Sequence, residues 1–321
     1  LSTIDDNYTF FSPPMIAEFE RQHSAGAYGG IGVHISQTTD GLIMIRDVSR
    51  DMPAIEAGVE AGDQLLAVDG VSLEGKTLDD AAFLLRGEPD TAVTIEVFRA
   101  SEDITLTIEI TRAEIKFRTV DAERVGESDE FGYIRLYSFN ENATRLIKDA
   151  IETFEEEGDL SGIILDLRGN PGGLLSQAVG VSDLFLDEGV VVTQRSRNGN
   201  QSIYKSSDGD LAEDIPLVVL VDESSASASE VVAGALQDRD RAVLIGQTTF
   251  GKGVVQHVHE LDGGAQLHVT VSVWLTPNDT QIQGQGLEPD IEVNVPDENA
   301  PTQDPYIESA IEYMQAVIAT P

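Results

Sequence analysis

Two stretches of this 321-residue chain combine residues that can carry out nucleophilic chemistry. The first reads Ser-Ala-Ser-Ala-Ser-Glu from Ser225 to Glu230, and the second places Lys252 in the run Phe-Gly-Lys-Gly-Val-Val-Gln. A serine hydroxyl becomes a good nucleophile only when a nearby base takes its proton. A lysine can be that base when apolar surroundings lower its pKa and keep it neutral. Because Val254 and Val255 follow Lys252 closely, the pattern favours a serine–lysine hydrolase.

The serine stretch has a second explanation. Alanine neighbours leave a serine side chain uncrowded, which suits a nucleophile. Serines also gather at helix starts, and Ser225 would then only cap the helix expected from about residue 226 to 237. The residues alone leave both explanations open.

Lys252 ends a match to GxxxxGK, the pattern of phosphate-binding loops, which begins at Gly246. The next residue is Gly253 instead of the Ser or Thr that binds magnesium, and an alternating strand follows instead of a helix. A phosphate loop without a helix N-terminus lacks its main anion-binding feature. A strand would instead put Lys252, Val254 and Gln256 on one face, where the Gln256 amide can orient the lysine amine.

A third stretch, Asp166 to Gly173, follows an apolar run and precedes a helix expected from residue 173 to 185. Its glycines Gly172 and Gly173 let backbone N–H groups face outward, toward an anion or a developing oxyanion. A tight turn without chemistry explains the same residues equally well. At the end of the helix that follows the serines, Asp238 either tunes the site or pairs with a neighbouring arginine.

Composition excludes several other functions. The chain has no cysteine, so thiol nucleophiles, disulfides and thiolate metal sites are ruled out. Its net charge of -37, spread along the chain, opposes partners that are nucleic acids or nucleotides and fits an acidic secreted protein or a high-salt habitat. His257 and His259 alternate without a third ligand, so we expect no metal. We see neither a membrane-spanning apolar run nor a signal peptide.

Periodicity divides the chain into four parts. Residues 1–26 contain a short helix at 14–22 and look like the remnant of a longer helical segment. Residues 27–113 are β-rich, with short helices at 54–57 and 78–86. From residue 114 to 300, strands alternate with helices around apolar strands at 161–167, 216–221 and 242–245, which predicts an α/β core with a mixed sheet. Residues 301–321 hold a terminal helix.

The β-rich part resembles a PDZ domain of the bacterial protease type. The resemblance implies that the N–H groups of Gly30, Ile31 and Gly32 hold the C-terminal carboxylate of a peptide. The peptide then adds as a strand beside the one that contains Val33. The alternative is that the glycines only make a tight turn. The matching residues are Gly29-Gly30-Ile31-Gly32, Pro53-Ala54, Ala57-Gly58, Gly62-Asp63 and Val68-Asp69-Gly70.

Four further stretches, in order, make the whole chain resemble the carboxy-terminal processing (tail-specific) proteases of peptidase family S41. The family implies an α/β protease core with the PDZ domain preceding it or inserted in it. It also implies that Ser227 is the nucleophile, Lys252 the general base and Gln256 its positioning partner. The stretches are Asp166–Gly173, Ser225–Asp238, Gly246–Gln256 and Gly284–Val293.

The same resemblance implies an oxyanion hole made by the Ala228 N–H and a glycine N–H from Gly172 or Gly173. Asp238 matches an aspartate of the family motif with a less certain role. The chain departs from the family in its short segment before the PDZ domain and in Ser224, where many members have a small residue such as glycine.

The expected substrates are proteins or peptides with exposed C-termini, cleaved without metal or cofactor outside the cytoplasm. A homo-oligomer and membrane attachment through a missing preceding segment stay open. The alternatives to a protease are a catalytically silent PDZ scaffold and, less favoured, a nucleotide hydrolase.

Overall fold

The computed structural model describes residues 6–209, 211–293 and 304–318. The chain forms two compact units, one made by Ala25–Phe117 and the other by the residues on either side of it. The β-rich unit is therefore inserted in the α/β unit, and the residues up to Ser24 belong to the α/β unit.

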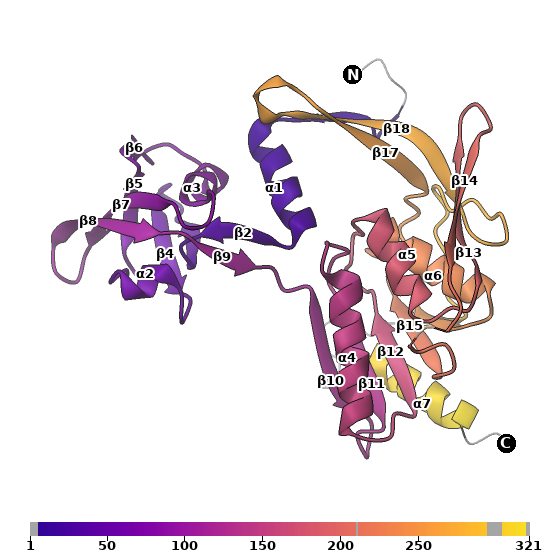
Figure 1. The fold of residues 1–321 in the computed structure, drawn as a ribbon. Coiled ribbons are helices and arrows are strands. Elements are labelled where there is room, and N and C mark those ends of the chain that lie inside the picture. The colour runs from indigo at the N-terminus through magenta and orange to yellow at the C-terminus, as the bar shows by residue number, and fades with distance from the viewer. Residues whose placement is uncertain (1–5, 210, 294–303, 319–321) are drawn as a thin grey trace. The chain divides into compact units, whose positions relative to one another are not determined.

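The inserted unit is a small β-structure with two short helices (Figure 1). Its six-stranded sheet has the order β3-β4-β5-β7-β8, with β6 paired to β5, and β2 pairs with β9 in a second ladder. The core is apolar and includes Ile45, Val68 and Ile95. The strands are β2 (Ala27–Gly30), β3 (Val33–Gln37), β4 (Ile43–Val48), β5 (Gln64–Val68), β6 (Val71–Ser72), β7 (Ala92–Arg99), β8 (Ile104–Thr111) and β9 (Ala113–Lys116), and the helices are α2 (Pro53–Glu56) and α3 (Leu78–Leu85).

A local sequence signal explains the start of this unit's longer helix, and a long-range ion pair stabilises its buried charge. Thr77 caps α3, and Asp80 returns the bond to the Thr77 N–H, which completes a capping box. Arg99 makes two hydrogen bonds with the buried Asp63 carboxylate, at 2.9 and 2.8 Å. Burial opposes the charge on Asp63, but the Arg99 partner outweighs it and keeps the pKa of Asp63 below its ordinary value.

The α/β unit is built on a six-stranded sheet of order β10-β11-β12-β15-β16-β19. All neighbouring pairs except β10–β11 are parallel. The sheet is therefore mixed, as expected, and the central strands β12 and β15 are buried along their whole length. The strands are β10 (Val120–Val125), β11 (Phe131–Leu136), β12 (Gly162–Asp166), β15 (Leu217–Val221), β16 (Val243–Gly246) and β19 (Ile291–Glu292).

Helices cover both faces of this sheet (Figure 1). Alternate residues of β15 separate the two cores: Val219 packs with α4, α5 and α6, whereas Val218 packs with Met314 of α7 on the other face. The helices are α4 (Ala143–Glu157), α5 (Leu175–Asp183), α6 (Ala228–Asp238) and α7 (Pro305–Ile318). Helix α5 begins two residues later than expected because Gly172 and Gly173 adopt positive φ angles that a right-handed helix excludes.

A second sheet in this unit has the order β1-β18-β13-β14, with β17 paired to β18. The N-terminal strand β1, drawn in indigo, lies antiparallel to β18 (Figure 1). Helix α1 (Pro14–Ala25) follows β1 and runs slightly beyond the helix expected at 14–22. The strands are β1 (Phe10–Ser12), β13 (Gly189–Ser196), β14 (Gln201–Ser206), β17 (Val254–Glu260) and β18 (Gln266–Leu275), with a short 3₁₀ turn at Asp262–Gly264.

Candidate active site

The three serines of the first stretch have different surroundings. The Ser225 hydroxyl, fully buried, donates to the Leu167 carbonyl at 2.8 Å and accepts from the Asp222 N–H. The Ser229 hydroxyl, also fully buried, donates to the Asn170 carbonyl at 2.9 Å. Only Ser227 is partly exposed among the three. Ser225 and Ser229 therefore hold the loop in place, and Ser227 is the serine that a substrate can reach.

Ser227 lies between the carboxyl end of β15 and the first turn of α6. Its backbone has φ 55° and ψ -110°, a conformation that non-glycine residues rarely adopt. Such strain is typical of the sharp strand-to-helix turns that present a nucleophile. Ser227, and not Ser225, is the residue that precedes the first residue of the helix.

The loop after β12 packs directly against this turn. A side-chain carbon added at Gly172 would lie only 2.8 Å from the Ala226 carbonyl oxygen and 2.9 Å from the Ala228 nitrogen, so glycine is required there. Asn170, fully buried, accepts from the Gly172 N–H at 2.9 Å and donates to the Leu136 carbonyl. The Gly172 N–H is thereby occupied.

Two backbone donors next to Ser227 remain without a partner in the described part of the chain. They are the N–H groups of Ala228, at the start of α6, and of Gly173. Of the two glycines expected to contribute to an oxyanion hole, Gly173 therefore has the free donor. Gly172 instead allows the loop after β12 to pack closely against the serine turn.

A buried carboxylate connects the serine turn to the lysine loop. Glu230, fully buried on α6, accepts from the Ser227 N–H at 2.9 Å and the Lys252 N–H at 2.8 Å through one oxygen. Its other oxygen accepts from the Thr249 hydroxyl and the Gly251 N–H, both at 2.6 Å. Four donors thus stabilise the buried charge and fix the two backbones together. Glu230 was not predicted to have a role, although the Ser-x-x-Glu spacing of a capping box was a signal for it.

Lys252 lies in a half-buried environment. Burial lowers the pKa of its amine below the ordinary value of 10.5, and the carboxylates of Glu20 and Glu230 oppose this effect. The amine lies 5.8 Å from the centre of the Tyr8 ring. Within the described residues no hydrogen bond joins the Lys252 amine to the Ser227 hydroxyl.

Gln256 reaches this region by a different geometry from the one expected. Strand β17 begins only at Val254, and a bulge between Val255 and Gln256 interrupts the alternation of its side chains. The Gln256 side-chain nitrogen donates to the Tyr8 carbonyl at 2.5 Å. The described part of the chain shows no hydrogen bond from Gln256 to Lys252.

Asp238 does not join these groups. It ends α6, eleven residues and about 16 Å of helix away from Ser227. Its carboxylate accepts from the Asn278 N–H at 2.8 Å instead of pairing with a neighbouring arginine. Arg239 pairs with Asp187, and Arg241 donates to backbone carbonyls.

In the loop that matches a phosphate-binding pattern, backbone N–H groups already donate to acceptors within the protein. The N–H groups of Gly251 and Lys252 donate to Glu230, and the Phe250 N–H donates to the Ser225 carbonyl. Strand β17 follows instead of a helix. These N–H groups are therefore unavailable to a phosphate.

A charged network supports the loop that carries Gly172. Arg168 donates to the fully buried Asp166 and also, at 3.0 and 2.8 Å, to both oxygens of Asp304 just before α7. Its guanidinium lies over the Tyr306 ring at 4.5 Å. Burial penalises the Arg168 charge, but its two carboxylate partners prevail and raise its pKa.

The candidate peptide-binding residues lie in the inserted unit. Strand β3, which begins at Val33, forms an edge of its sheet. The N–H groups of Ile31 and Gly32 make no hydrogen bond within the described residues, whereas Gly30 belongs to the β2–β9 ladder. Gly32 has φ 80°, and an added side-chain carbon would lie 2.2 Å from Met52.

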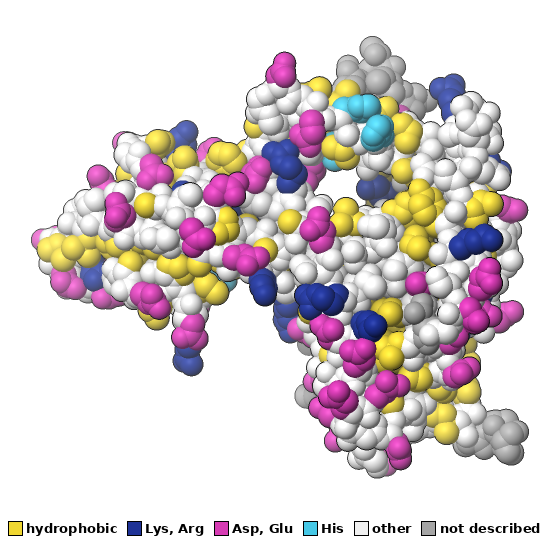
Figure 2. Space-filling model, in the orientation of Figure 1, with side chains coloured by type: hydrophobic (Ala, Val, Ile, Leu, Met, Phe, Trp, Pro, Cys, Tyr) yellow, Lys and Arg dark blue, Asp and Glu magenta, His cyan; other side chains and the backbone are white. Residues whose placement is uncertain are grey.

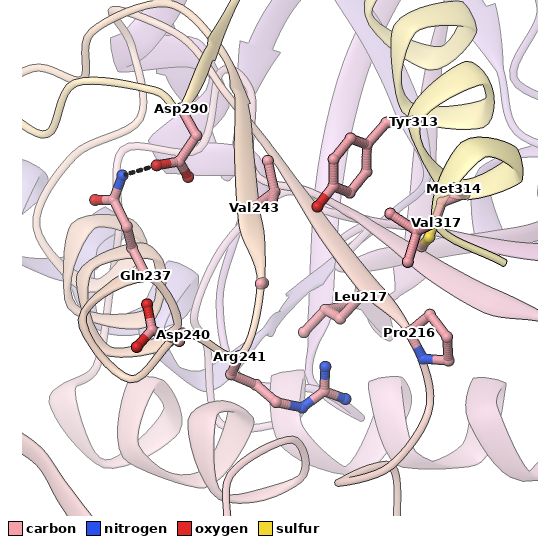
Figure 3. Close-up of a pocket in the computed structure, with 11 residues that line it drawn as sticks. Pro216, Leu217, Gln237, Asp240, Arg241, Val243, Asp290, Tyr313, Met314 and Val317 are labelled. Carbon is pink, nitrogen blue, oxygen red and sulfur yellow. Dashed lines mark hydrogen bonds between the residues drawn. The ribbon is translucent and has the colours of Figure 1, made fainter. Parts of the chain in front are cut away.

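A cavity of about 360 Å³ lies elsewhere, between the ends of α6 and α7 (Figure 3). Its lining includes Leu217 and Val243, which begin β15 and β16, together with Tyr313 and Met314 of α7. Ser227 follows the opposite, carboxyl end of β15, and open α/β sheets bind their ligands at the carboxyl ends of their strands. The cavity is therefore separate from the candidate active site.

In the described residues, neither the charged side chains nor the potential metal ligands indicate a second functional site. Acidic side chains are scattered over the face shown in Figure 2 and do not form one patch. Across residues 6–209, 211–293 and 304–318, no three His, Asp or Glu side chains gather closely enough to hold a metal ion. Nor is any described helix both long and apolar enough to span a bilayer. The rings of His257 and His259 lie 4.5 Å apart, as expected for one strand face.

Comparison with protein families gives two matches. Residues 130–293 match the model of peptidase family S41, and residues 44–99 match a PDZ domain. A carboxyl-terminal-processing protease of Synechocystis is 39% identical over 302 residues, which are 92% of this chain and 70% of that protein. A carboxy-terminal-processing protease of Bartonella bacilliformis is 40% identical over 280 residues, 86% of this chain and 64% of that protein.

Solved structures agree with these matches. A photosystem II D1 C-terminal processing protease superposes with a TM-score of 0.57 at 31% identity, covering 98% of this chain and 83% of that chain. A putative S41 protease from Bacteroides fragilis has a TM-score of 0.56, covering 98% of this chain and 87% of that chain. At 17% identity, this match shows a shared fold only.

Proposed function

The chain belongs to peptidase family S41, and from this premise we propose that it is a serine endopeptidase with Ser227 as nucleophile and Lys252 as general base. The observation that carries the proposal is the Glu230 carboxylate, one oxygen of which binds the backbone N–H groups of both residues. Among Ser225, Ser227 and Ser229, Ser227 is also the partly exposed one, and burial lowers the pKa of Lys252.

In the proposed mechanism, neutral Lys252 takes the Ser227 proton as the hydroxyl oxygen attacks the peptide carbonyl. The free N–H groups of Ala228 and Gly173 hold the oxyanion. The lysine then protonates the leaving amine, and an acyl-enzyme remains. Water, deprotonated by the Lys252 amine, then attacks the ester. The acid is released, and the protonated lysine returns its proton to the Ser227 oxygen. Substrate binding brings the Lys252 amine within hydrogen-bond distance of Ser227, since such contacts are often long in the free enzyme.

The proposed substrates are proteins with an exposed C-terminus, which the inserted unit binds. Strand β3 offers a free edge for an added strand, and the N–H groups of Ile31 and Gly32 are available to a terminal carboxylate. Val33 begins the pairing strand, and Gly30 ends β2 directly before the two free N–H groups. We propose that this takes place outside the cytoplasm, which the absence of cysteine permits.

The test is cleavage of an unstructured protein with an apolar C-terminus, in the presence of a chelator and without nucleotide. The native chain should cleave it, Ser227→Ala should not, and amidation of the substrate's C-terminus should slow cleavage. A folded native chain that binds the tail without cleaving it would support the silent scaffold. Cleavage that depends on a nucleotide would contradict the proposal.

A further inference from the structure

The N-terminal segment Asp6–Ser12 lies beside the proposed general base, although 240 or more positions separate them in the sequence. The side-chain nitrogen of Gln256 donates to the Tyr8 carbonyl at 2.5 Å, and the Tyr8 ring lies 5.8 Å from the Lys252 amine. Neither contact is part of the proposed dyad, so the segment has a role still to be assigned.

Several contacts hold Tyr8 in this place. Before it, Asp6 accepts from the Tyr8 N–H at 3.0 Å and also from the Thr9 hydroxyl. The Thr9 hydroxyl in turn accepts from the Thr270 N–H of β18 at 3.1 Å. After it, β1 pairs with β18 from Phe10 to Ser12. Tyr8 is thus fixed from both sides against the second sheet.

Side-chain contacts reinforce the pairing of β1 with β18. The Phe10 ring stacks on His268, with 4.4 Å between ring centres. His268 and the Ser12 hydroxyl both contact the Glu20 carboxylate of α1. Glu20 is also the first of the two carboxylates that favour the charged form of Lys252, the other being Glu230 of α6. These are the charged groups that act on the lysine from the elements around it.

The contact with Gln256 determines which end of its amide is free. A backbone carbonyl only accepts hydrogen bonds, so the amide must offer its NH₂ group to Tyr8. The amide oxygen of Gln256 is then left to accept from a lysine N–H. A general base held in this way keeps its lone pair available for the serine proton.

The ring of Tyr8 has a separate effect. Burial is the cause that lowers the pKa of Lys252, against two carboxylates that raise it. At 5.8 Å the ring is near the outer limit, about 6 Å, of a cation–π contact, so we expect its exclusion of water to outweigh its attraction for the charged amine.

We infer that Tyr8 is a positioning residue of this site: its ring shields the Lys252 amine from water, and its carbonyl fixes Gln256 with the amide oxygen left for that amine. The inference rests on the proposed function. It predicts that Tyr8→Ala raises the pKa of Lys252, whereas Tyr8→Phe leaves it in place because the ring remains.

The direct measurement is the titration of Lys252 by NMR in ¹³C-lysine-labelled chains that carry Ser227→Ala to prevent self-cleavage. The chain has only Lys76, Lys116, Lys148, Lys205 and Lys252, so the signals are few. We expect Tyr8→Ala to shift the midpoint of Lys252 upward by roughly one unit. An unchanged or lowered midpoint would overturn the inference.

Two controls make the result specific. Phe11→Ala changes a half-exposed side chain on the same segment and should leave the Lys252 midpoint unchanged. An equal shift in Phe11→Ala would overturn the inference, because the effect would then come from loosening the segment. Tyr8→Phe should titrate like the parent chain, and an upward shift there would equally contradict shielding by the ring.

Activity gives a second readout. The acid limb of the kcat/KM profile of Tyr8→Ala should move to higher pH by the same amount, with most of the rate recovered at high pH. Raised activity at every pH would show that the segment inhibits the site and would overturn the inference. A native chain that cleaves nothing would refute the proposed function, while the NMR titration would still decide the role of Tyr8.

Discussion

The carboxylate of Glu230 accepts a hydrogen bond from the backbone N–H of Lys252 at 2.8 Å, so a helix and a loop that follows another strand share one buried charge. The same oxygen binds the Ser227 N–H. The relative position of the two proposed catalytic residues therefore depends on a third residue, whose carboxylate binds both of their backbones.

Replacing this carboxylate by an amide should damage both stability and activity. Glu230→Gln puts an NH₂ group against two of the four donors, and we expect a loss of roughly 2–3 kcal/mol of unfolding free energy. kcat/KM should fall at least tenfold in the folded fraction. Glu223→Gln, on an exposed residue just before the serine turn, is the control. Equal stability and activity of Glu230→Gln and the parent chain would contradict the role of Glu230.

The glycine that packs against the serine turn should be irreplaceable. In Gly172→Ala the residue would keep φ 106°, and its new side-chain carbon would lie only 2.8–2.9 Å from backbone atoms of Ala226 and Ala228. The oxyanion donors must therefore move. We expect kcat/KM to fall by about 10²-fold or more. Gly169→Ala shares the positive φ, at 70°, but has open space and should keep most of its activity. Similar activity in both variants would remove the geometric argument.

Activity should rise with pH. The Lys252 amine acts as a base only when neutral, and burial lowers its pKa from 10.5. kcat/KM should therefore rise about tenfold per pH unit up to that lowered pKa and then level off. A flat profile between pH 5 and pH 9 would be inconsistent with a lysine base.

The lowered pKa of Lys252 also makes the free energy of unfolding depend on pH. Between the folded-state pKa of Lys252 and 10.5, the unfolded chain binds the proton more tightly, so stability should decrease as pH falls through this window. Lys252→Met should remove this contribution, and comparing the unfolding midpoints of the two chains across the window measures it. Parallel curves would contradict the assignment.

The ion pair between Asp304 and Arg168 should stabilise the packing of the C-terminal helix α7. Asp304→Asn breaks the two hydrogen bonds to Arg168, which connect α7 to the loop that carries Gly172. Because Asp304 is 37% exposed, solvent screens the pair and we expect a loss of only about 1 kcal/mol in urea unfolding. Asp149→Asn, in an exposed pair with Arg145 on α4, should change almost nothing.

The pH dependence of this pair has the opposite sign to that of Lys252. Burial opposes the Asp304 charge, but Arg168 prevails and lowers the pKa of Asp304 below 3.8. Its stabilising contribution is therefore complete above 3.8 and is lost as pH falls through the lowered pKa. The difference between the native chain and Asp304→Asn should disappear at the lowest pH; a constant difference would argue against the ion pair.

The sequence predicted the parts of the fold that local patterns determine. Apolar strands separated by amphipathic helices indicated the mixed α/β core, and glycine-rich turns indicated a PDZ-like unit, inserted in the core or preceding it. Strand β14 was missed because its side chains are mostly exposed and polar, which leaves no clear apolar alternation. The start of α5 was misplaced because glycine φ angles cannot be read from spacing.

The candidate site was only partly predictable for the same reason. The resemblance of short motifs to family S41 pointed to Ser227 and Lys252, but the contacts that hold them are long-range. Glu230 acts on a loop 22 positions away, and Tyr8 meets Gln256 across 248 positions. Strand alternation placed Gln256 beside Lys252 on a regular strand, and the bulge in β17 shows why that argument was incomplete.

The central claim is that Ser227 attacks and Lys252 removes its proton, and the most direct measurement is the cleavage rate of one unstructured substrate by matched variants. Ser227→Ala, Lys252→Ala and Lys252→Arg should each lose at least 10³-fold in kcat/KM while remaining folded, because arginine keeps the charge but cannot act as the base. Ser229→Ala, which removes a buried structural hydroxyl, should retain far more activity. Substantial cleavage by Lys252→Arg, or by Ser227→Ala, would contradict the account.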